Sequence, residues 1–415
     1  MIANMLPAEV LLEIFSYCSL EDVAMSIPYV CSWWRDVSRD TCLWKHFVYR
    51  PLRTVTNKEI IDILRLSPQL KAVDFSKHYI RSDIVDVLIE CCPKLERLCV
   101  PWDAFCNLNK CKISTALVNL KVLIFTGTEL KNSALEYLSN QFPTLEHLEF
   151  SDLYFTKNEL VAFLGKMQHQ LHTLSFRCSS SDGHCILPYV AACKKIKTLC
   201  LHNLCDNLTV NLPLEKLPNL KSVTSLTLHI SSLIAIRNYM RDFMFSPNLV
   251  ELQLYVCPIF PNDFFSVTAR NCPLLRKLTV HGCSTLLQDR SLGSLECFKK
   301  LTSLTICNNP YITNEGIKNL GKVSGLTYLD FYECKKLTVQ CFTVICGFTN
   351  LRVLKFDLKN SNDVVDLSVG HVKNRSLQFM FYKCTSTVLE YFKKQGMVVR
   401  LLTDKSETFG MSVVL

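Results

Sequence analysis

Glycine is scarce in this sequence, at 12 of 415 residues. No glycine-rich phosphate-binding loop occurs, which removes the strongest sequence signal for a nucleotide-binding enzyme. No run of about 18 uncharged apolar residues occurs either, so we expect no membrane span. The first residues, MIANMLPAEVLLEIF, have no basic segment before the apolar one and reach an acidic residue at Glu9. We therefore expect no secretory signal, and a location in the cytoplasm, the nucleus or both.

Cys-x-x-Cys pairs are also absent, although the chain has 22 cysteines. In a reducing compartment that number of cysteines does not predict disulfides. A structural zinc ion needs four convergent ligands, so we predict no metal site and no cofactor. No cysteine is accompanied by an identifiable histidine and carboxylate. The sequence therefore predicts no catalytic residue and a protein that is not an enzyme.

The charge is positive, with a formal net charge of +9 at pH 7, but it is dispersed along the chain. The short basic clusters mostly lie just before or after strand-like segments, where solvated turns explain them: Lys194-Lys195, Lys299-Lys300, Lys335-Lys336 and Lys393-Lys394. A nucleic-acid-binding surface needs a continuous basic stripe, which the sequence does not show. We therefore do not predict nucleic acid as a partner.

An internal repeat governs most of the chain. Thirteen copies of an LxxLxL-like motif follow one another at steps of 25, 26 or, once, 27 residues. They are LKAVDF (70–75), LERLCV (95–100), LKVLIF (120–125), LEHLEF (145–150), LHTLSF (171–176), IKTLCL (196–201), VTSLTL (223–228), LVELQL (249–254), LRKLTV (275–280), LTSLTI (301–306), LTYLDF (326–331), LRVLKF (351–356) and LQFMFY (377–382). So many copies in phase predict a repeat architecture.

Each repeat reads as a strand followed by a helix. Within the motif, apolar and polar residues alternate as in a half-buried strand. Between the motifs, segments such as 132–139 and 263–269 carry apolar residues at helical spacing. Such a unit cannot bury its own apolar face, so neighbouring units must stack and align their strands in a parallel sheet. The pattern resembles the cysteine-containing class of leucine-rich repeats. We predict an α/β fold, a curved solenoid of about thirteen repeats with strands on the concave side and helices on the convex side.

The cysteines occupy repeated positions within this unit. Cys92, Cys193 and Cys272 lie three residues before their motifs, in a position that elsewhere holds mostly phenylalanine, leucine or valine. We interpret them as buried apolar residues. A second position, eight residues after the motif starts, holds Cys257, Cys283, Asn309 and Cys334. A side chain that donates a hydrogen bond to backbone carbonyls suits the turn that leaves the strand.

Residues 1–48 lie outside the repeat and predict three short helices. Val10, Leu11, Ile14, Phe15 and Cys18 form an amphipathic stripe, and Ser19 with Asp22 forms a capping-box pattern. A second helix must end near Pro28, and a third contains Val30, Trp34 and Val37. The remaining boundaries predict a linker with the first repeat helix at 49–69, the solenoid at 70–402 and a tail at 403–415. The repeat at 202–228 is expected to be irregular, and MVVRLL (397–402) is a candidate capping strand.

The segment from Leu6-Pro7 through Val30-Cys31 and Trp34 to Leu43-Trp44 resembles an F-box, with Cys18 where the family usually has leucine. An F-box joined to leucine-rich repeats is a known family architecture. The resemblance implies a substrate receptor of a Skp–cullin–F-box ubiquitin ligase, which docks on a Skp-family adaptor and, through it, on a cullin scaffold. We expect the adaptor-binding residues to be Leu6, Pro7, Val10, Ile14 and Leu20. We expect the core of the module to contain Phe15, Val30, Trp34, Leu43 and Trp44.

The concave face is the predicted surface for a protein substrate. Side chains two, four and six positions after each motif start should point to that face. Exposed aromatics with neighbouring charges are typical of interaction hot spots. The candidates are Tyr255, Lys277, Tyr328, Asp330, Tyr332, Phe379 and Phe381. The alternative function is a repeat scaffold or inhibitor that binds proteins without ubiquitin ligase activity.

Overall fold

The computed structural model describes residues 6–44, 47–51, 55–106, 117–126, 134–153, 157–178, 187–202, 214–229, 244–255, 263–283, 287–357, 377–383, 386–394 and 397–402. The predicted tail, residues 403–415, lies outside these ranges. The chain divides into two compact units. The N-terminal unit comprises residues 1–180 and 192–196, and the C-terminal unit comprises residues 181–191 and 197–415. The two units are described separately below.

The N-terminal unit begins with short helices that pack on one another. They are α1 (Ala8–Ser16), α2 (Leu20–Met25), the 3-10 helix η2 (Ile27–Tyr29), α3 (Ser32–Ser38) and α4 (Thr41–Trp44). The predicted capping of the second helix is confirmed, since the side chain of Ser19 accepts a hydrogen bond from the backbone N–H of Asp22 at 3.0 Å. Helix α2 ends before Pro28, as expected for a residue that lacks a backbone donor.

Strands and helices then alternate through the rest of this unit. The strands are β1 (Val48–Tyr49), β2 (Ala72–Asp74), β3 (Arg97–Pro101), β4 (Val122–Thr126), β5 (His147–Leu153) and β6 (Thr173–Cys178). The helices between them are α5 (Asn57–Leu66), α6 (Ser82–Cys91), α7 (Trp102–Cys106), α9 (Ala134–Gln141) and α10 (Lys157–Met167). Neighbouring strands pair in parallel and in sequence order from β1 to β6. Because β1 pairs with β2, the sheet starts one strand earlier than the repeat motif predicts.

The C-terminal unit continues the same alternation. Its strands are β7 (Thr198–His202), β8 (Ser225–His229), β9 (Glu251–Tyr255), β10 (Lys277–His281), β11 (Ser303–Cys307), β12 (Tyr328–Tyr332), β13 (Val353–Asp357), β14 (Gln378–Lys383) and β15 (Val398–Leu401). Its helices include η3 (Leu214–Asn219), α12 (Phe264–Asn271), α13 (Asp289–Gly293), η5 (Ser294–Cys297), α14 (Asn314–Leu320), η6 (Val339–Cys341), α15 (Phe342–Ile345) and α16 (Ser386–Lys394), and α11 spans Leu187–Ala192. The predicted capping strand is confirmed as β15, which pairs in parallel with β14.

The repeat motif sets the register within each unit. In the C-terminal unit the central motif leucines lie directly beside one another across six strands: Leu226, Leu252, Leu278, Leu304, Leu329 and Leu354. All are at most 2% exposed. Burying a leucine side chain contributes about 1.5–3 kcal/mol, so this row alone strongly favours the stacked arrangement. Ser225 pairs with Thr198 and Glu251, which confirms the motif at 223 in the weakest repeat.

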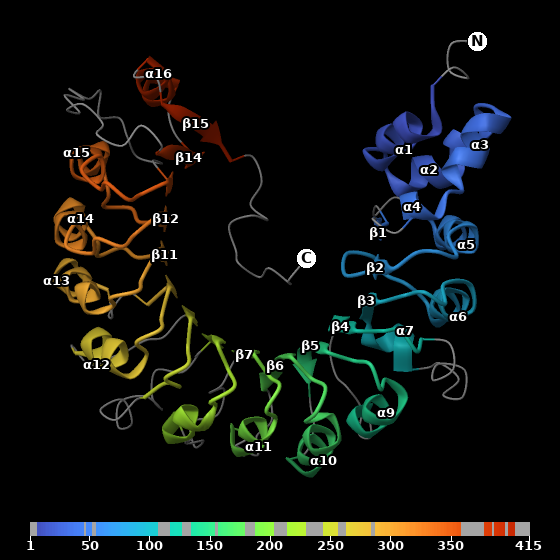
Figure 1. Cartoon of the computed structure of the whole chain (residues 1–415), viewed down its shortest axis with the longest axis horizontal. Coiled ribbons are helices and arrows are strands. Elements are labelled where there is room, and N and C mark those ends of the chain that lie inside the picture. The colour runs from blue at the N-terminus through green and yellow to red at the C-terminus, as the bar shows by residue number, and fades with distance from the viewer. Residues whose placement is uncertain are drawn as a thin grey trace. The chain divides into compact units, whose positions relative to one another are not determined.

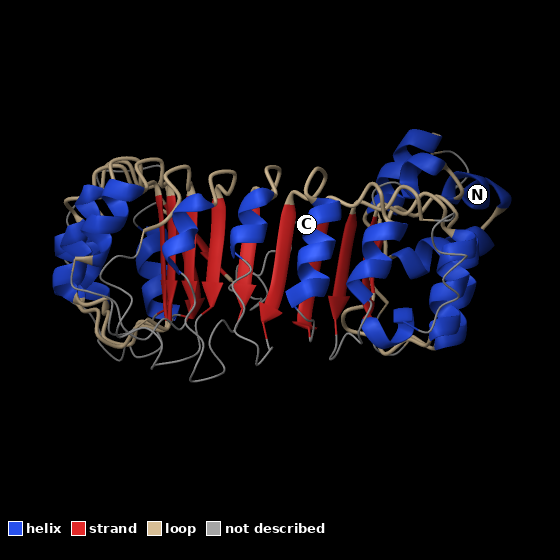
Figure 2. Cartoon of the chain, turned by 90° about the horizontal axis from the view of Figure 1, so that it is seen from below, coloured by secondary structure: helices blue, strands red, loops and turns tan. Residues whose placement is uncertain are grey.

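The two faces of each sheet differ. In both units the helices cover one side of the strands (Figure 1), and neighbouring strands run in the same direction (Figure 2). We call the side without helices the open face. The predicted α/β repeat fold, with strands on one side and helices on the other, is confirmed.

The turns that leave the strands use the second cysteine position as predicted. The Cys334 thiol lies 3.6 Å from the backbone oxygen of Ile306, and the Cys283 thiol lies 3.4 Å from that of His281. The amide of Asn309 donates to the backbone oxygen of Leu287 at 3.1 Å. Cys257 lies outside the described residues. The confirmed positions therefore tie each turn to neighbouring backbone through a buried donor.

The first cysteine position is buried as predicted. Cys92, Cys193 and Cys272 are at most 1% exposed. Burial raises the pKa of the Cys92 and Cys272 thiols to about 12 and that of Cys193 to about 11. These thiols are protonated at neutral pH, and the thiolate is the nucleophilic form. Their role is therefore packing.

Candidate functional site

Helix α1 divides its apolar residues between two faces. Leu11 and Phe15 are fully buried, whereas Val10 is 42% and Ile14 is 44% exposed. Each pair is spaced i, i+4, so each lies along one side of the helix. Pro7 precedes the helix and is exposed. The outward pair is therefore available to a partner, while the inward pair holds the helix in place.

Trp33 extends this outward surface. Its indole N–H donates to the backbone oxygen of Leu6 at 3.3 Å, so α3 lies against the start of α1. Trp33 is 37% exposed, as is Leu6. We call the five residues the N-terminal apolar surface: Leu6, Pro7, Val10, Ile14 and Trp33. Trp33 was not among the predicted residues, because the helix that contains Trp33 and Trp34 could turn either one inward.

Leu20 does not belong to that surface. It is only 5% exposed, so its predicted adaptor contact is wrong. The reason is the cap at Ser19, which starts α2 at Leu20 and places Leu20, Val23 and Ala24 on one inward stripe. The side chain therefore stabilises the module instead of contacting a partner directly.

Val30 was predicted in the core of the module but is 56% exposed. Helix α3 starts only at Ser32, and the Cys31 side chain caps it by accepting from the backbone N–H of Trp34 at 3.4 Å. Val30 therefore precedes the helix and lies outside its apolar stripe.

Of the other predicted core residues of this module, Phe15, Leu43 and Trp44 are buried and Trp34 is half-buried. The ring of Trp34 packs edge-on against Phe15, with centroids 5.2 Å apart. Leu43 is 3% and Trp44 is 5% exposed. The indole N–H of Trp44 donates to the backbone oxygen of Ser38 at 2.8 Å, which satisfies its buried donor.

The open face of the C-terminal unit carries a row of rings at the ends of four strands. The centroids of His202 and His229 are 6.2 Å apart, those of His229 and Tyr255 are 6.2 Å apart, and those of Tyr255 and His281 are 5.5 Å apart. Burial raises the pKa of Tyr255 to about 12 and lowers that of His281. Both rings are therefore neutral at physiological pH. The four residues occupy the same position in their motifs, and that shared position is the sequence signal that connects them.

A second cluster lies on β12 to β14. The hydroxyl of Tyr328 donates to Asp330 at 3.1 Å, and the hydroxyl of Tyr382 donates to both carboxylate oxygens of Asp330, at 2.8 and 3.0 Å. The ring of Tyr382 packs edge-on against Tyr332 at 4.9 Å. The ammonium of Lys355 lies 5.9 Å from the centre of the Tyr328 ring, within range of a cation–π attraction.

Asp330 organises this cluster from within. It is 5% exposed, so the prediction that it contacts a substrate directly is wrong. Burial raises the pKa of its carboxyl, while the hydrogen bond from Tyr382, the Lys355 charge and the hydrogen bond from Tyr328 oppose that shift. The half-exposed Tyr328, Tyr332 and Lys355 remain available on the open face. Lys277, at the start of β10, is exposed there.

Phe379 and Phe381 lie on the opposite side of the sheet from their predicted place. Both are 0% exposed. Strand β14 pairs Phe379 with Leu354 and Phe381 with Phe356, one residue away from the register that the motif LQFMFY suggests. A shift of one residue exchanges the two faces of a strand. Tyr382, which the sequence reading missed, takes the place on the open face instead.

Two further features would bear on function: a metal site and a membrane span. Among the residues that the structure describes, no group of three or more histidines, cysteines, aspartates or glutamates could hold a metal ion. In the same ranges no helix is long and apolar enough to cross a membrane.

Comparisons with known proteins give one matching family model and several solved structures of similar fold. An F-box-like family model matches residues 3–50, which include the whole N-terminal apolar surface. Rad7, in the crystal structure of the Rad7 and Elc1 complex in yeast, is similar in fold, with a TM-score of 0.55 and 20% sequence identity. That similarity covers 90% of this chain and 92% of Rad7. Residues 3–50 are therefore an F-box-like segment, and the chain as a whole shares the fold of that solved structure.

Two further solved structures are less similar to this chain. The TLR13–ssRNA13 complex has a TM-score of 0.42 at 16% identity, and the similarity covers 82% of this chain and 48% of that one. An internalin from Listeria monocytogenes has a TM-score of 0.35 at 15% identity, with 85% and 90% covered. The N-terminal apolar surface lies within the F-box-like segment, and the open face lies on the strands of the repeats.

Proposed function

We propose that this chain is an F-box and leucine-rich-repeat protein and acts as the substrate-recognition subunit of a ubiquitin ligase of the Skp–cullin–F-box type. The observation that carries the proposal is the outward face of α1 within a matched F-box. Val10 and Ile14 are exposed although the same helix buries Leu11 and Phe15 completely. Exposed apolar patches of this kind mark protein interaction sites. The fold neighbour Rad7 was crystallised with a partner, Elc1, which supports an adaptor-bound state.

The repeats supply the surface for the substrate. Half-exposed Tyr255, Tyr328 and Tyr332, with Lys277 and Lys355, form an open face rich in the residue types that carry binding energy. Holding substrate and ligase together raises their effective concentration to the order of millimolar. That role needs no acid, base or nucleophile in this chain, so we propose a non-catalytic subunit. It acts in the cytoplasm, the nucleus or both.

Adaptor binding is tested with the full chain and a purified Skp-family adaptor. The variant Val10→Ala with Ile14→Ala should weaken the complex at least about tenfold, because interface hot spots cost about 2 kcal/mol or more. The control is Leu66→Ala with Val118→Ala, two apolar residues of the repeats that are 51% and 45% exposed. It should bind as the parent does. Failure of the parent protein to form the complex would refute the proposal.

Substrate binding is tested with the adaptor-deficient variant in cells. Proximity labelling with the variant that carries Val10→Ala and Ile14→Ala should enrich the substrates. The parent protein should label them less, because it ubiquitinates them and they are then lost. Adding Tyr328→Ala and Lys355→Ala should remove them from the labelled set. The alternative, a scaffold or inhibitor without ligase activity, predicts the same labelled proteins from parent and variant and no adaptor complex.

A further inference from the structure

The turns that enter the strands of the C-terminal unit carry a line of exposed cations. The sequence shows these residues as scattered, but each lies in the turn that leads into a strand or at the first residue of that strand. We call them the basic rim, and all are exposed: Lys197, Lys221, Arg276, Lys277, Lys299, Lys300, Lys322 and Arg352. From residue 219 onward, the matching turns and first strand residues, at 219–225, 246–251, 272–277, 298–303, 321–328 and 348–353, contain only one carboxylate, Glu251.

Backbone hydrogen bonds place three of the rim cations, Lys197, Arg276 and Arg352, in one line. The backbone N–H of Thr224 donates to the backbone oxygen of Lys197. In the same way the N–H of Val250 donates to Thr224, and the N–H of Arg276 donates to Val250. From Arg276 the same series of bonds continues through Thr302 and Thr327 to Arg352. Each step crosses one strand, about 4.8 Å, so the line is on the order of 30 Å long. The parallel register therefore brings cations that are scattered in the sequence to one edge of the sheet.

The rim cations are not neutralised within the part of the chain that the structure describes. No carboxylate there forms an ion pair with any of the eight. Glu251 is instead engaged with its neighbours, since it accepts hydrogen bonds from Ser225 at 3.3 Å and Gln253 at 2.9 Å. The rim is therefore a surface of uncompensated positive charge beside the open face.

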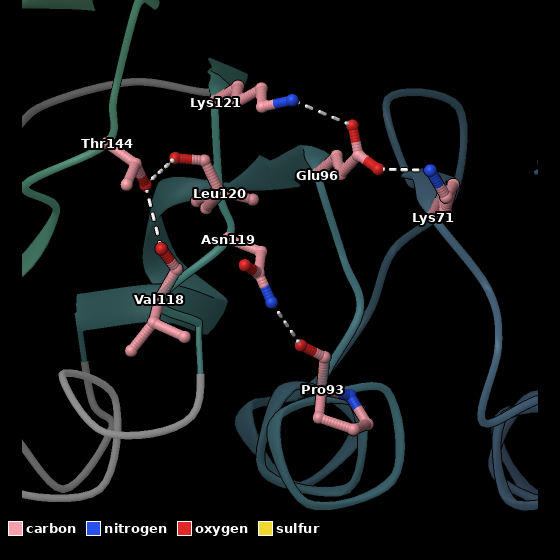
Figure 3. Close-up of polar contacts among 8 residues, drawn as sticks. All are labelled: Lys71, Pro93, Glu96, Val118, Asn119, Leu120, Lys121 and Thr144. Atoms are coloured by element: carbon pink, nitrogen blue, oxygen red, sulfur yellow. Dashed lines mark hydrogen bonds and ion pairs between the residues drawn. The ribbon is translucent and has the colours of Figure 1, made fainter.

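The N-terminal unit shows that the fold does not require this charge. At the second motif position it alternates the signs, as Lys71, Glu96 and Lys121. Glu96 forms ion pairs with both lysines, at 3.2 Å for Lys121 (Figure 3). The same position thus accepts an acid, a base or, as at Thr302 and Thr327, a neutral residue. The concentration of cations in the C-terminal unit needs another explanation.

We propose that the basic rim binds an acidic polypeptide segment, rich in aspartate, glutamate or phosphorylated residues. The inference rests on the proposed function, since the rim borders the face that we assign to the protein substrate. Single-stranded nucleic acid is bound by cations interleaved with exposed aromatic residues on which the bases stack. In these turns and first strand residues, the aromatic residues that are even half-exposed are Tyr328 and Phe348, both toward one end of the rim. Charge complementarity of this kind mainly speeds association and selects the partner.

The test uses the full chain in complex with a Skp-family adaptor and a fluorescein-labelled oligoglutamate peptide, measured by fluorescence anisotropy over a salt series. The rim variant is Lys299→Glu with Lys300→Glu. Its matched control is Lys393→Glu with Lys394→Glu, an exposed lysine pair at the end of α16 with the same change in net charge. The rim variant should weaken binding about tenfold and flatten its salt dependence. The control should change it less than about twofold.

Three results would overturn the inference. The parent complex would bind no peptide, both variants would lose binding equally, or a short DNA duplex would bind more tightly than the peptide and depend on the same rim. A phosphoserine peptide measured beside oligoglutamate distinguishes the two sources of negative charge. Size-exclusion chromatography of the same samples monitors the adaptor complex. If that complex forms and the peptide fails, only the inference fails; if the complex does not form, the proposed function fails.

Discussion

The hydroxyl of Tyr382 lies 2.8 and 3.0 Å from the two carboxylate oxygens of Asp330, a residue two strands away in the sheet. Both side chains are buried, at 8% and 5% exposed. The bond joins the last repeats of the C-terminal unit across the strand that lies between them. It also holds the Tyr382 ring against Tyr332, and so shapes the exposed part of the open face.

Removing the Tyr382 hydroxyl should destabilise this region. In Tyr382→Phe the buried carboxylate loses its main donor, and hydrogen bonds to charged groups contribute about 1.5–3 kcal/mol. We expect a loss of that size in urea unfolding followed by circular dichroism. The comparison is Tyr328→Phe. This change should cost less, because the Tyr328 hydroxyl lies 3.1 Å from the carboxylate and the residue is half-exposed. Equal effects of the two variants would contradict this assignment.

Asp330 should make stability depend on pH. Burial raises the pKa of its carboxyl in the folded protein above that of the unfolded chain. The unfolded state therefore releases the proton first, so the folded state loses stability as the pH rises from about 4, the ordinary aspartate pKa. Asp330→Asn removes this titration. The unfolding free energy of the variant minus that of the parent should be constant below that pH and should increase above it. A difference that does not change with pH would refute the prediction.

The turns after β10, β11 and β12 place one residue each in the left-handed region: Gly282 with φ 65°, Asn308 with φ 50° and Glu333 with φ 54°. This conformation costs a side-chain-bearing L-residue roughly 1–2 kcal/mol, and glycine avoids the cost. Gly282→Ala should therefore destabilise the protein by about 1 kcal/mol. Glu333→Gly should stabilise it by a smaller amount, because glycine also loses more entropy on folding. Thermal unfolding measures both variants, and changes in the same direction would be unexpected.

Thiol reactivity should follow the repeat positions. Cys42 and Cys297 are exposed, whereas Cys92, Cys272 and Cys334 are buried. Burial is the main cause that raises the pKa of each of these three thiols to about 12. Iodoacetamide reacts with the thiolate, so the exposed pair should be alkylated in the folded protein and the buried three only after unfolding. Peptide mass spectrometry before and after denaturation measures this. Rapid alkylation of Cys92 in the folded state would contradict its place in the core.

The repeat was predictable because its signal is local and recurs. Each motif alternates apolar and polar residues, and thirteen copies in phase leave one way to stack them. The register of the last motif was not predictable in this way. LQFMFY has apolar or aromatic residues on both alternations, so either set fits a core, and only pairing with β13 decides that Phe379 and Phe381 face inward.

The F-box shows the same division. Its sequence pattern identified the module and the two faces of α1, because an i, i+4 spacing fixes which residues share a side of a helix. The places of Leu20 and Val30 depended on where caps at Ser19 and Cys31 start their helices. Trp33 joined the outward surface only because its indole reaches the backbone of Leu6, 27 residues earlier.

The sequence by itself determined that this protein has a short helical module followed by stacked strand–helix repeats, since helix and strand periodicity are properties of neighbouring residues. Only the tertiary structure decided which residues meet across strands. Asp330 contacts Tyr382, and the eight cations of the basic rim share one edge of the sheet, because parallel stacking places residues about 26 positions apart about 4.8 Å from one another. That distance is set by backbone hydrogen bonds between repeats, which no single segment of the chain contains.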